Sequence, residues 1–204
     1  LLVDQSQRPS TRSLRHAHGA SATTVSNTAT AAGRMNPLAL PFPVTVAVIP
    51  FRPYSREVAE SAFQQQREVL LHLPMEAQSE QEHGEANVLR VSDTPDHVTA
   101  TIERSLDSVP HAVGVNNHMG SRFTEDGERM RLVLERIRGH GLFFLDSVTT
   151  PRSSARSAAQ AVGVGYLARD VFLDDTADDA AIRKQLQALI DAAKQDGSAI
   201  GIGH

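Results

Sequence analysis

The sequence predicts a parallel α/β fold, and three features of the chain support this expectation. Short apolar runs alternate with segments of helical period from residue 37 onward, which is typical of repeated β-α units. The runs are continuously apolar, as expected of parallel strands that are covered on both faces. The length of 204 residues suits one domain of this class. About seven such strands would fit a closed or incomplete barrel, or an open doubly wound sheet.

The predicted strands are short runs of apolar residues. They are VTVAVI (44–49), EVLLHL (68–73), AVGV (112–115), LFFL (142–145), VFL (171–173) and AIGI (199–202). LLV at residues 1–3 is a further candidate and would be the first strand.

The helices are predicted from their caps and from the spacing of their apolar residues. Ser55 opens the first helix, and Thr94 followed by Pro95 is typical of an N-cap and a first helical position. Thr124 is expected to cap the third helix. Gly139 and Gly141 are expected to end that helix. Residues 152–162 are predicted to form an Ala-rich helix stopped by Gly163. An amphipathic helix is predicted at residues 182–193 and ends at Gly197.

The chain is expected to have two parts, residues 1–36 and residues 37–204. Most of the first part is rich in Ser, Thr, Ala and Arg, so we interpret it as a linker, a long insertion or a poorly ordered segment. Its beginning has no basic region followed by an apolar one, so no signal peptide is predicted. The chain starts without Met, which suggests a fragment. The second part is the predicted folded domain.

Composition narrows the classes of function. The formal net charge is −4 and is mixed along the chain, so no basic surface for nucleic acid is expected. No apolar run approaches the roughly 18 residues of a membrane span. The sequence contains no Cys and nine His. Any metal ion must therefore be held by His, Asp or Glu.

Polar side chains gather where the predicted strands end. In parallel α/β folds, the carboxyl ends of the strands lie at one edge of the sheet and form the usual place for a site. We therefore expect one shared site from residues that are far apart in sequence. The candidates are Asp4, His72, Asn116, Asn117, His118, Asp146, Arg152 and His204.

Several of these residues also have a purely structural interpretation. His72 could be a core histidine bonded to a carbonyl group, and His118 could cap the next helix. Asn116 and Asn117 could hold their own loop. The acidic residues Asp174, Asp175, Asp178 and Asp179 suit the start of the long helix better than a site. Arg152 at a helix start is disfavoured by the helix dipole, which suggests a carboxylate partner such as Asp146.

The residue types limit the chemistry. A Gly-rich phosphate loop and a GxSxG nucleophile elbow are both missing from the sequence. Two or three imidazoles with a carboxylate are a natural ligand set for zinc or another divalent ion. Such an ion activates water and polarises a carbonyl group. Hydrolysis of an ester or amide is the reaction class that these residues favour.

Six ordered stretches resemble the divergent polysaccharide deacetylase family. They are PVTVAVIPFRPYSREVA, EVLLHLPME, VGVNNHMGSRFTED, GLFFLDSVTTPRSSA, RDVFLDD and SAIGIGH, and they run from about Pro43 to His204. The family is distantly related to the NodB-type carbohydrate esterases. The resemblance implies a distorted or incomplete (β/α) barrel, removal of acetyl groups from a polysaccharide or amino sugar, and a periplasmic or cell-envelope location.

The resemblance also implies roles for individual residues. His72 and His118 match the histidines that hold a divalent metal, with zinc as the expected ion. Asp146 and Arg152 match polar positions of the pocket. His204 resembles the strand-end histidine that protonates the leaving group.

The chain departs from the family pattern at its front. The family has a strand that ends in two Asp residues, which serve as base and metal ligand. The nearest match here is LLVDQS, where Asp4 is followed by the neutral Gln5. Asp4 is therefore the expected third ligand and base, with Asp146 as the alternative base. Asn116, Asn117, Ser121 and Arg152 are the expected substrate-binding residues.

Two other functions remain open from the sequence. The first is a catalytically inactive carbohydrate-binding or scaffold protein of the cell envelope on the same fold. The sequence has no Trp and only two Tyr, although sugar-binding clefts commonly use such rings. The second is a metal-dependent hydrolase of a different substrate, such as a small amide.

Overall fold

A computed structural model describes residues 44–79 and 87–203, together with the backbone of residues 23–27. Its core is one sheet of eight parallel strands in the order β6-β5-β4-β3-β2-β1-β8-β7. The strands are β1 (Thr23–Asn27), β2 (Val44–Val48), β3 (Val69–Met75), β4 (Ala112–Met119), β5 (Phe143–Asp146), β6 (Tyr166–Ala168), β7 (Val171–Phe172) and β8 (Gly201–Gly203). The predicted parallel α/β class is confirmed.

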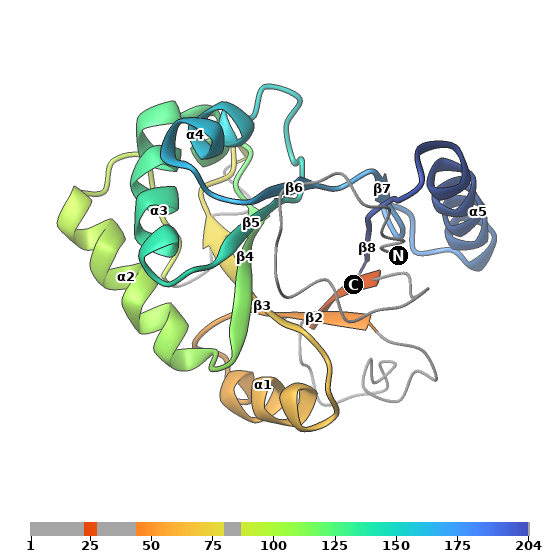
Figure 1. Cartoon of the computed structure of the whole chain (residues 1–204), viewed down its shortest axis with the longest axis horizontal. Helices are drawn as coiled ribbons and strands as arrows, with labels where there is room; N and C mark the ends of the chain where they lie inside the picture. The colour runs from red at the N-terminus through yellow and green to blue at the C-terminus, as the bar shows by residue number, and fades with distance from the viewer. Residues whose placement is uncertain (1–22, 28–43, 80–86, 204) are drawn as a thin grey trace.

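The sheet curves strongly, and its two edge strands follow one another in the chain (Figure 1). Two residues, Arg169 and Asp170, separate β6 from β7. The Arg169 N–H donates to the Asp146 carbonyl at 2.9 Å, and the Asp170 N–H donates to the Ile200 carbonyl at 2.8 Å. The described residues show no ladder between β6 and β7. The edges are thus joined by the chain itself rather than by strand pairing.

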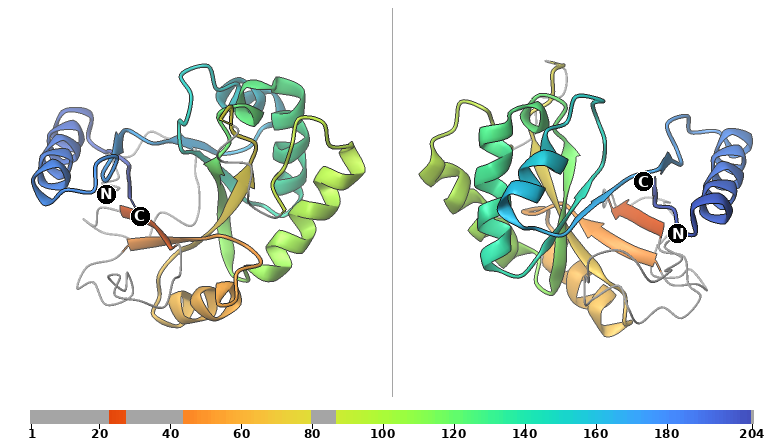
Figure 2. Two further views of the ribbon diagram at one scale, coloured as in Figure 1. Left: turned by 180° about the vertical axis from the view of Figure 1, so that it is seen from behind. Right: turned by 45° about the horizontal axis from the view of Figure 1, so that its top comes forward.

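The helices cover the outside of the curve. They are α1 (Ser55–Gln64), α2 (Pro95–Ser108), α3 (Gly127–Gly139), α4 (Ala155–Val162) and α5 (Asp179–Asp196), with a short 3-10 helix, η4, at Phe123–Glu125. Helices α1 to α4 lie around β2 to β6, whereas α5 lies on the opposite side beside β7 and β8 (Figures 1 and 2). Among the described helices, none is long and apolar enough to cross a membrane.

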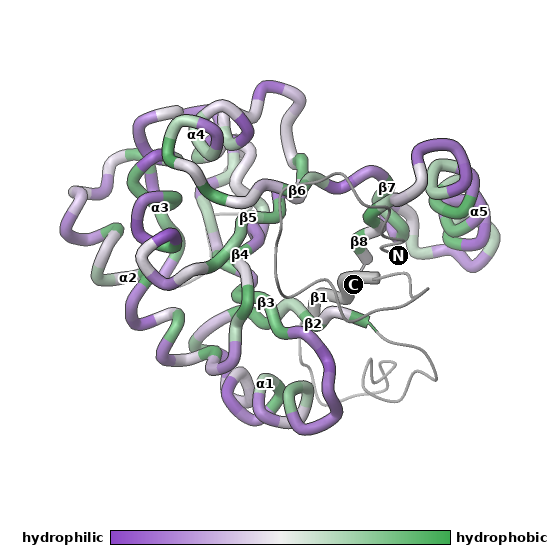
Figure 3. The backbone as a smooth tube through the Cα atoms, in the orientation of Figure 1, coloured by the Kyte–Doolittle hydropathy of each residue, from purple (hydrophilic) through white to green (hydrophobic). Residues whose placement is uncertain are grey.

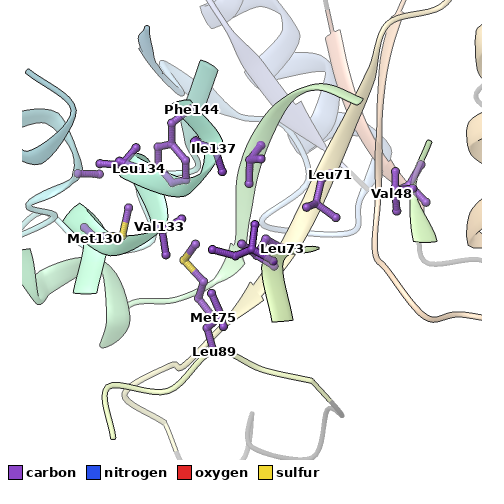
Figure 4. Packing of buried hydrophobic residues seen from close by; sticks show 14 of the residues in the cluster. Val48, Leu71, Leu73, Met75, Leu89, Met130, Val133, Leu134, Ile137 and Phe144 are labelled. Carbon is purple, nitrogen blue, oxygen red and sulfur yellow. The ribbon is translucent and has the colours of Figure 1, made fainter. Parts of the chain in front are cut away.

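Apolar side chains fill both faces of the sheet. The larger cluster lies between the outer face and the helices, where Phe144 lies beside Leu134 and Ile137 of α3 (Figure 4). A smaller cluster occupies the inner face, and its buried members are Ala47, Leu70, Phe143, Leu145, Ile200 and Ile202. Helices α3 and α5 alternate hydrophilic and hydrophobic residues along their length, as expected of helices with one buried face (Figure 3).

Most predicted elements are present at or near their predicted ranges, but two strands were missed. Strand β1 lies inside the segment that was interpreted as a linker, insertion or poorly ordered part, and it pairs with β2 and β8. Strand β6 was not among the predicted strands, although helix α4 ends at Gly163 as predicted, with a left-handed backbone at that residue. The sheet therefore has eight strands instead of about seven. The candidate strand at residues 1–3 lies outside the described residues.

Two predicted boundaries were wrong. Helix α3 is capped by Asp126, whose carboxylate accepts the N–H groups of Glu128 and Arg129, whereas Thr124 lies in η4 and donates to the Gly120 carbonyl. Strand β4 continues through Asn116, Asn117 and His118, which were expected in a loop, because β3 is also long and pairs with all of them. The Thr94 cap and Pro95 start of α2 are confirmed.

Gly114 of β4 is expected to be intolerant of any side chain. A Cβ atom there would lie 2.6 Å from the Cζ atom of Phe143, well inside van der Waals contact. We expect Gly114→Ala to lower the free energy of unfolding by about 1–3 kcal/mol in urea denaturation, as overpacked cores do. Gly139→Ala is the matched control, because a Cβ at the end of α3 meets nothing within 4 Å. Equal stabilities of the two variants would contradict this packing argument.

Candidate functional site

Two buried histidines from neighbouring strands form the centre of the candidate site. His72 lies in β3 and His118 in β4, and they are 3 % and 9 % exposed. The Nε2 atom of His72 is 3.0 Å from the Nδ1 atom of His118. Their rings meet edge to face, with centroids 4.8 Å apart. The predicted approach of these two residues is therefore found in the structure.

The histidine pair lies on the inner face of the sheet. Side chains alternate between the faces of a strand, so the positions two residues beyond an inner-face residue also point inward. Leu70 belongs to the inner cluster, and a Cβ on Gly114 would meet the inner-face ring of Phe143. His72 follows Leu70 by two positions, and His118 follows Gly114 by four. Both imidazoles thus stand above the inner apolar cluster near the carboxyl ends of their strands.

Asn116 lies beside the pair on the same face. It is level with His72 on one side and Leu145 on the other in the parallel ladders, and it is fully buried. Its Nδ2 group donates to the Ser147 Oγ atom at 3.3 Å. The Asn116 Oδ1 atom has no hydrogen-bond partner among the described residues.

Asn117 points to the other side of β4 and fixes the loop after β5. Its Oδ1 atom accepts the Ser147 N–H at 2.8 Å, and its Nδ2 group donates to the Met119 carbonyl at 2.6 Å. The Ser147 hydroxyl donates to the Asn117 carbonyl at 2.7 Å. Asn117 therefore holds the chain around the site, where Met119 and Val148 both have positive φ angles.

The structure does not bring Asp146 to the histidine pair. Asp146 alternates with the inner-face residue Leu145, and its carboxylate accepts bonds on the helix side of the sheet. The donors are the Val148 N–H at 2.8 Å, the Ser153 hydroxyl at 2.7 Å and the Tyr166 hydroxyl at 3.0 Å. Burial, reinforced by the Asp146 carboxylate, raises the pKa of Tyr166, which keeps its hydroxyl protonated as a donor.

Arg152 pairs with Glu125 and not with Asp146, which corrects the expected partner. The Arg152 Nη2 atom is 3.0 Å from Glu125 Oε1, which also accepts the Thr150 hydroxyl at 2.6 Å and the Gln78 Nε2 group at 2.9 Å. Ser121 belongs to the same rim, where its hydroxyl accepts the Gln78 N–H at 3.0 Å. This network joins the loops after β3, β4 and β5 around the site.

The rim network should make stability depend on pH. The Thr150 hydroxyl, followed by Arg152, lowers the pKa of Glu125 below its usual value. A lowered pKa in the folded state stabilises the protein above the unfolded pKa, and this contribution is lost as the pH falls through the folded pKa. We expect Glu125→Gln to lower the urea midpoint at pH 7, and the difference from the unchanged protein to vanish near pH 3. A difference that persists at pH 3 would contradict an ionic origin.

The histidine pair fits a divalent metal ion. Zinc binds imidazole nitrogens at about 2.0–2.1 Å, so two nitrogens 3.0 Å apart can reach one ion. Within residues 44–79 and 87–203, no group of three metal-binding side chains is found. Asp4 and His204, the other expected participants, lie outside the described residues.

Ser147 and Glu125 are polar residues near the site that are not among the predicted site residues. Ser147 had one recognisable signal, because it directly follows the fifth strand with Asp146. Glu125 carried no such signal, since it is the last residue of η4 and its three partners come from the loops after β3 and β5.

Fold and site together define a parallel α/β protein with a buried imidazole pair at the carboxyl ends of its strands. The sequence profile of the divergent polysaccharide deacetylases matches residues 27–204. The chain belongs to this family, as its motifs predicted.

Similar proteins come from several bacteria. YibQ, an uncharacterised protein of Escherichia coli K12, is 44 % identical over 167 residues, which are 82 % of this chain and 52 % of YibQ. An uncharacterised protein of Haemophilus influenzae is 37 % identical over 166 residues, which are 81 % of this chain and 59 % of that protein. The chain thus spans only about half the length of these curated relatives.

A solved structure shares the fold. The uncharacterised protein ATU2773 of Agrobacterium tumefaciens C58 superposes with a TM-score of 0.79 at 22 % identity, over 90 % of this chain and 77 % of that one. At this identity the likeness supports the α/β fold alone.

Proposed function

We propose that this chain is a metal-dependent hydrolase that removes acetyl groups from a polysaccharide or amino sugar. The observation that carries the proposal is the buried pair of His72 and His118, with 3.0 Å between its nitrogens, in a chain of the divergent polysaccharide deacetylase family. Family membership supports a carbohydrate substrate. The location that goes with this proposal is the periplasm or cell envelope.

His72 and His118 would hold the divalent ion, with Asp4 as a third ligand and zinc as the first metal to test. When bound, such an ion supplies Lewis acidity toward the acetyl carbonyl and lowers the pKa of water. Neutral imidazole is suited to binding a metal ion, because its unprotonated ring nitrogen carries a lone pair. The apolar inner cluster below them limits access of bulk water.

Two further residues transfer protons in the proposed mechanism. Asp4 removes a proton from the attacking water, whose oxygen forms a bond to the acetyl carbon. His204 donates a proton to the leaving nitrogen or oxygen as its bond to that carbon breaks, and acetate is the second product. Asp146 has no role in these steps, because its carboxylate binds donors on the helix side.

The test is acetate release from an N-acetylated chito-oligosaccharide and from an O-acetylated xylo-oligosaccharide. The protein is assayed after dialysis against chelator and again after addition of zinc. We expect acetate from at least one substrate, only with added metal. No acetate from either substrate would reject the hydrolase. Tight binding of an oligosaccharide without turnover would instead support the inactive carbohydrate-binding protein.

A further inference from the structure

We propose that the Asn116 side-chain oxygen selects amide substrates over esters at the site of the proposed hydrolase. The inference rests on that proposed function and names its substrate class, an N-acetylated sugar. The juxtaposition that supports it is a buried acceptor atom on the inner face, level with His72 in the ladder between β3 and β4.

A chain of hydrogen bonds fixes which atom of the Asn116 amide faces which way. The Ser147 hydroxyl donates its only proton to the Asn117 carbonyl at 2.7 Å. The Ser147 oxygen can therefore only accept from Asn116, and it does so from Nδ2 at 3.3 Å. Turning the amide over would set two acceptor oxygens against each other. The Asn116 Oδ1 atom is thus held as an acceptor directed away from Ser147.

The Asn116 Oδ1 atom lies in a buried environment, where a hydrogen-bond donor would stabilise it. Asn116 is fully buried, and its ladder neighbours are His72 and the apolar Leu145. Leaving a buried carbonyl oxygen without a partner is unfavourable, because the atom has lost its hydrogen bonds to water. No described residue donates to Oδ1. A bound molecule that brings a donor to this position would recover that free energy.

The two kinds of acetyl group differ in this respect. An acetamido group carries an N–H donor next to its carbonyl carbon, whereas an acetyl ester has only an oxygen there. The amide can donate to Oδ1 while its carbonyl faces the histidine pair. The ester would place a second acceptor against Oδ1. Sites that bind a substrate N–H reject analogues without it, because their own buried polar group is left unpaired.

The variant Asn116→Leu keeps the approximate volume and removes the acceptor. With zinc added, kcat/KM is measured for 4-nitroacetanilide and 4-nitrophenyl acetate, whose different intrinsic reactivities cancel when variant and unchanged protein are compared. We expect a loss of about 10- to 100-fold for the amide. For the ester we expect an unchanged or higher value, because the variant removes the acceptor that opposes the ester oxygen. Equal losses for both substrates, or no loss for either, would overturn the inference.

A binding measurement separates this inference from the proposed function. If neither acetate release nor chromophore release is detected, the hydrolase is rejected, and calorimetry with tri-N-acetylchitotriose then decides about Asn116. We expect the unchanged protein to bind this ligand at least about 10-fold more tightly than Asn116→Leu. Equal affinity, or no binding to the unchanged protein, would overturn the inference. Circular dichroism confirms that the variant is folded.

Discussion

Replacing Asp146 by Ala is expected to lower the free energy of unfolding by about 2–4 kcal/mol without changing metal affinity. The substitution would leave the Tyr166 hydroxyl, the Ser153 hydroxyl and the Val148 N–H without their acceptor. Each of these groups is at least partly buried, so its lost bond is poorly replaced by water. Urea denaturation measures the stability, and a zinc titration measures the affinity.

Two further variants make the interpretation of Asp146 sharper. Asp146→Asn keeps one acceptor oxygen and should lose less stability than the Ala variant. Asp191→Ala is the control, because Asp191 is an exposed carboxylate that accepts a side-chain bond from Gln187 on α5. We expect it to cost less than about 1 kcal/mol. A stable Asp146→Ala variant that has lost zinc would show that Asp146 serves the site after all.

Titration of Tyr166 gives an independent measurement of the same contact. Burial is the larger cause of its raised pKa, and the Asp146 carboxylate adds to it. In Asp146→Ala the phenol should therefore ionise at lower pH than in the unchanged protein, while remaining above its usual value of about 10. Ultraviolet absorbance of the phenolate reports this change.

The alternation of apolar runs and helical segments was enough to predict most of the fold. Strands β2, β3 and β5 are buried in the structure, because helices cover their outer face and apolar side chains fill the inner face. Strand β1 could not be predicted in the same way. Its residues TTVSN stand in a Ser/Thr-rich segment, and their place is set by two distant partners, β2 and β8.

The candidate site was predictable only in part. The meeting of His72 and His118 followed from parallel strands, whose carboxyl ends share one edge. Side chains of adjacent residues in a strand point to opposite faces of the sheet. Whether Asn116 and Asn117, or Leu145 and Asp146, lie on opposite faces therefore depends on where each strand ends. The predicted fourth strand ended before Asn116, so both amides were expected after that strand and Asp146 after the next one, at the same edge of the sheet. The continuous ladder to Met119 is what separates them.

Replacing either His72 or His118 should abolish stoichiometric metal binding. In the proposed metal site, the two imidazoles whose nitrogens lie 3.0 Å apart would bind one ion together, so the loss of one would remove a direct ligand. Changes in the groups that merely orient a ligand already cost about 10- to 100-fold in affinity, so we expect a loss of at least about 100-fold for His72→Gln and His118→Gln. Zinc competition with a chromophoric chelator measures the dissociation constants, and mass spectrometry measures the bound metal.

The control for this prediction is His97→Gln, because His97 is an exposed imidazole whose side chain is 53 % accessible and lies 4.0 Å from Asp93. It should bind zinc like the unchanged protein. Urea denaturation in the presence of chelator checks that His72→Gln and His118→Gln fold. Gln was chosen because its polar side chain is similar in length to that of His. If both folded variants keep one equivalent of tightly bound zinc, the metal lies elsewhere and the proposed hydrolase loses its centre. If each loses it and His97→Gln does not, the two strand-end histidines form one site.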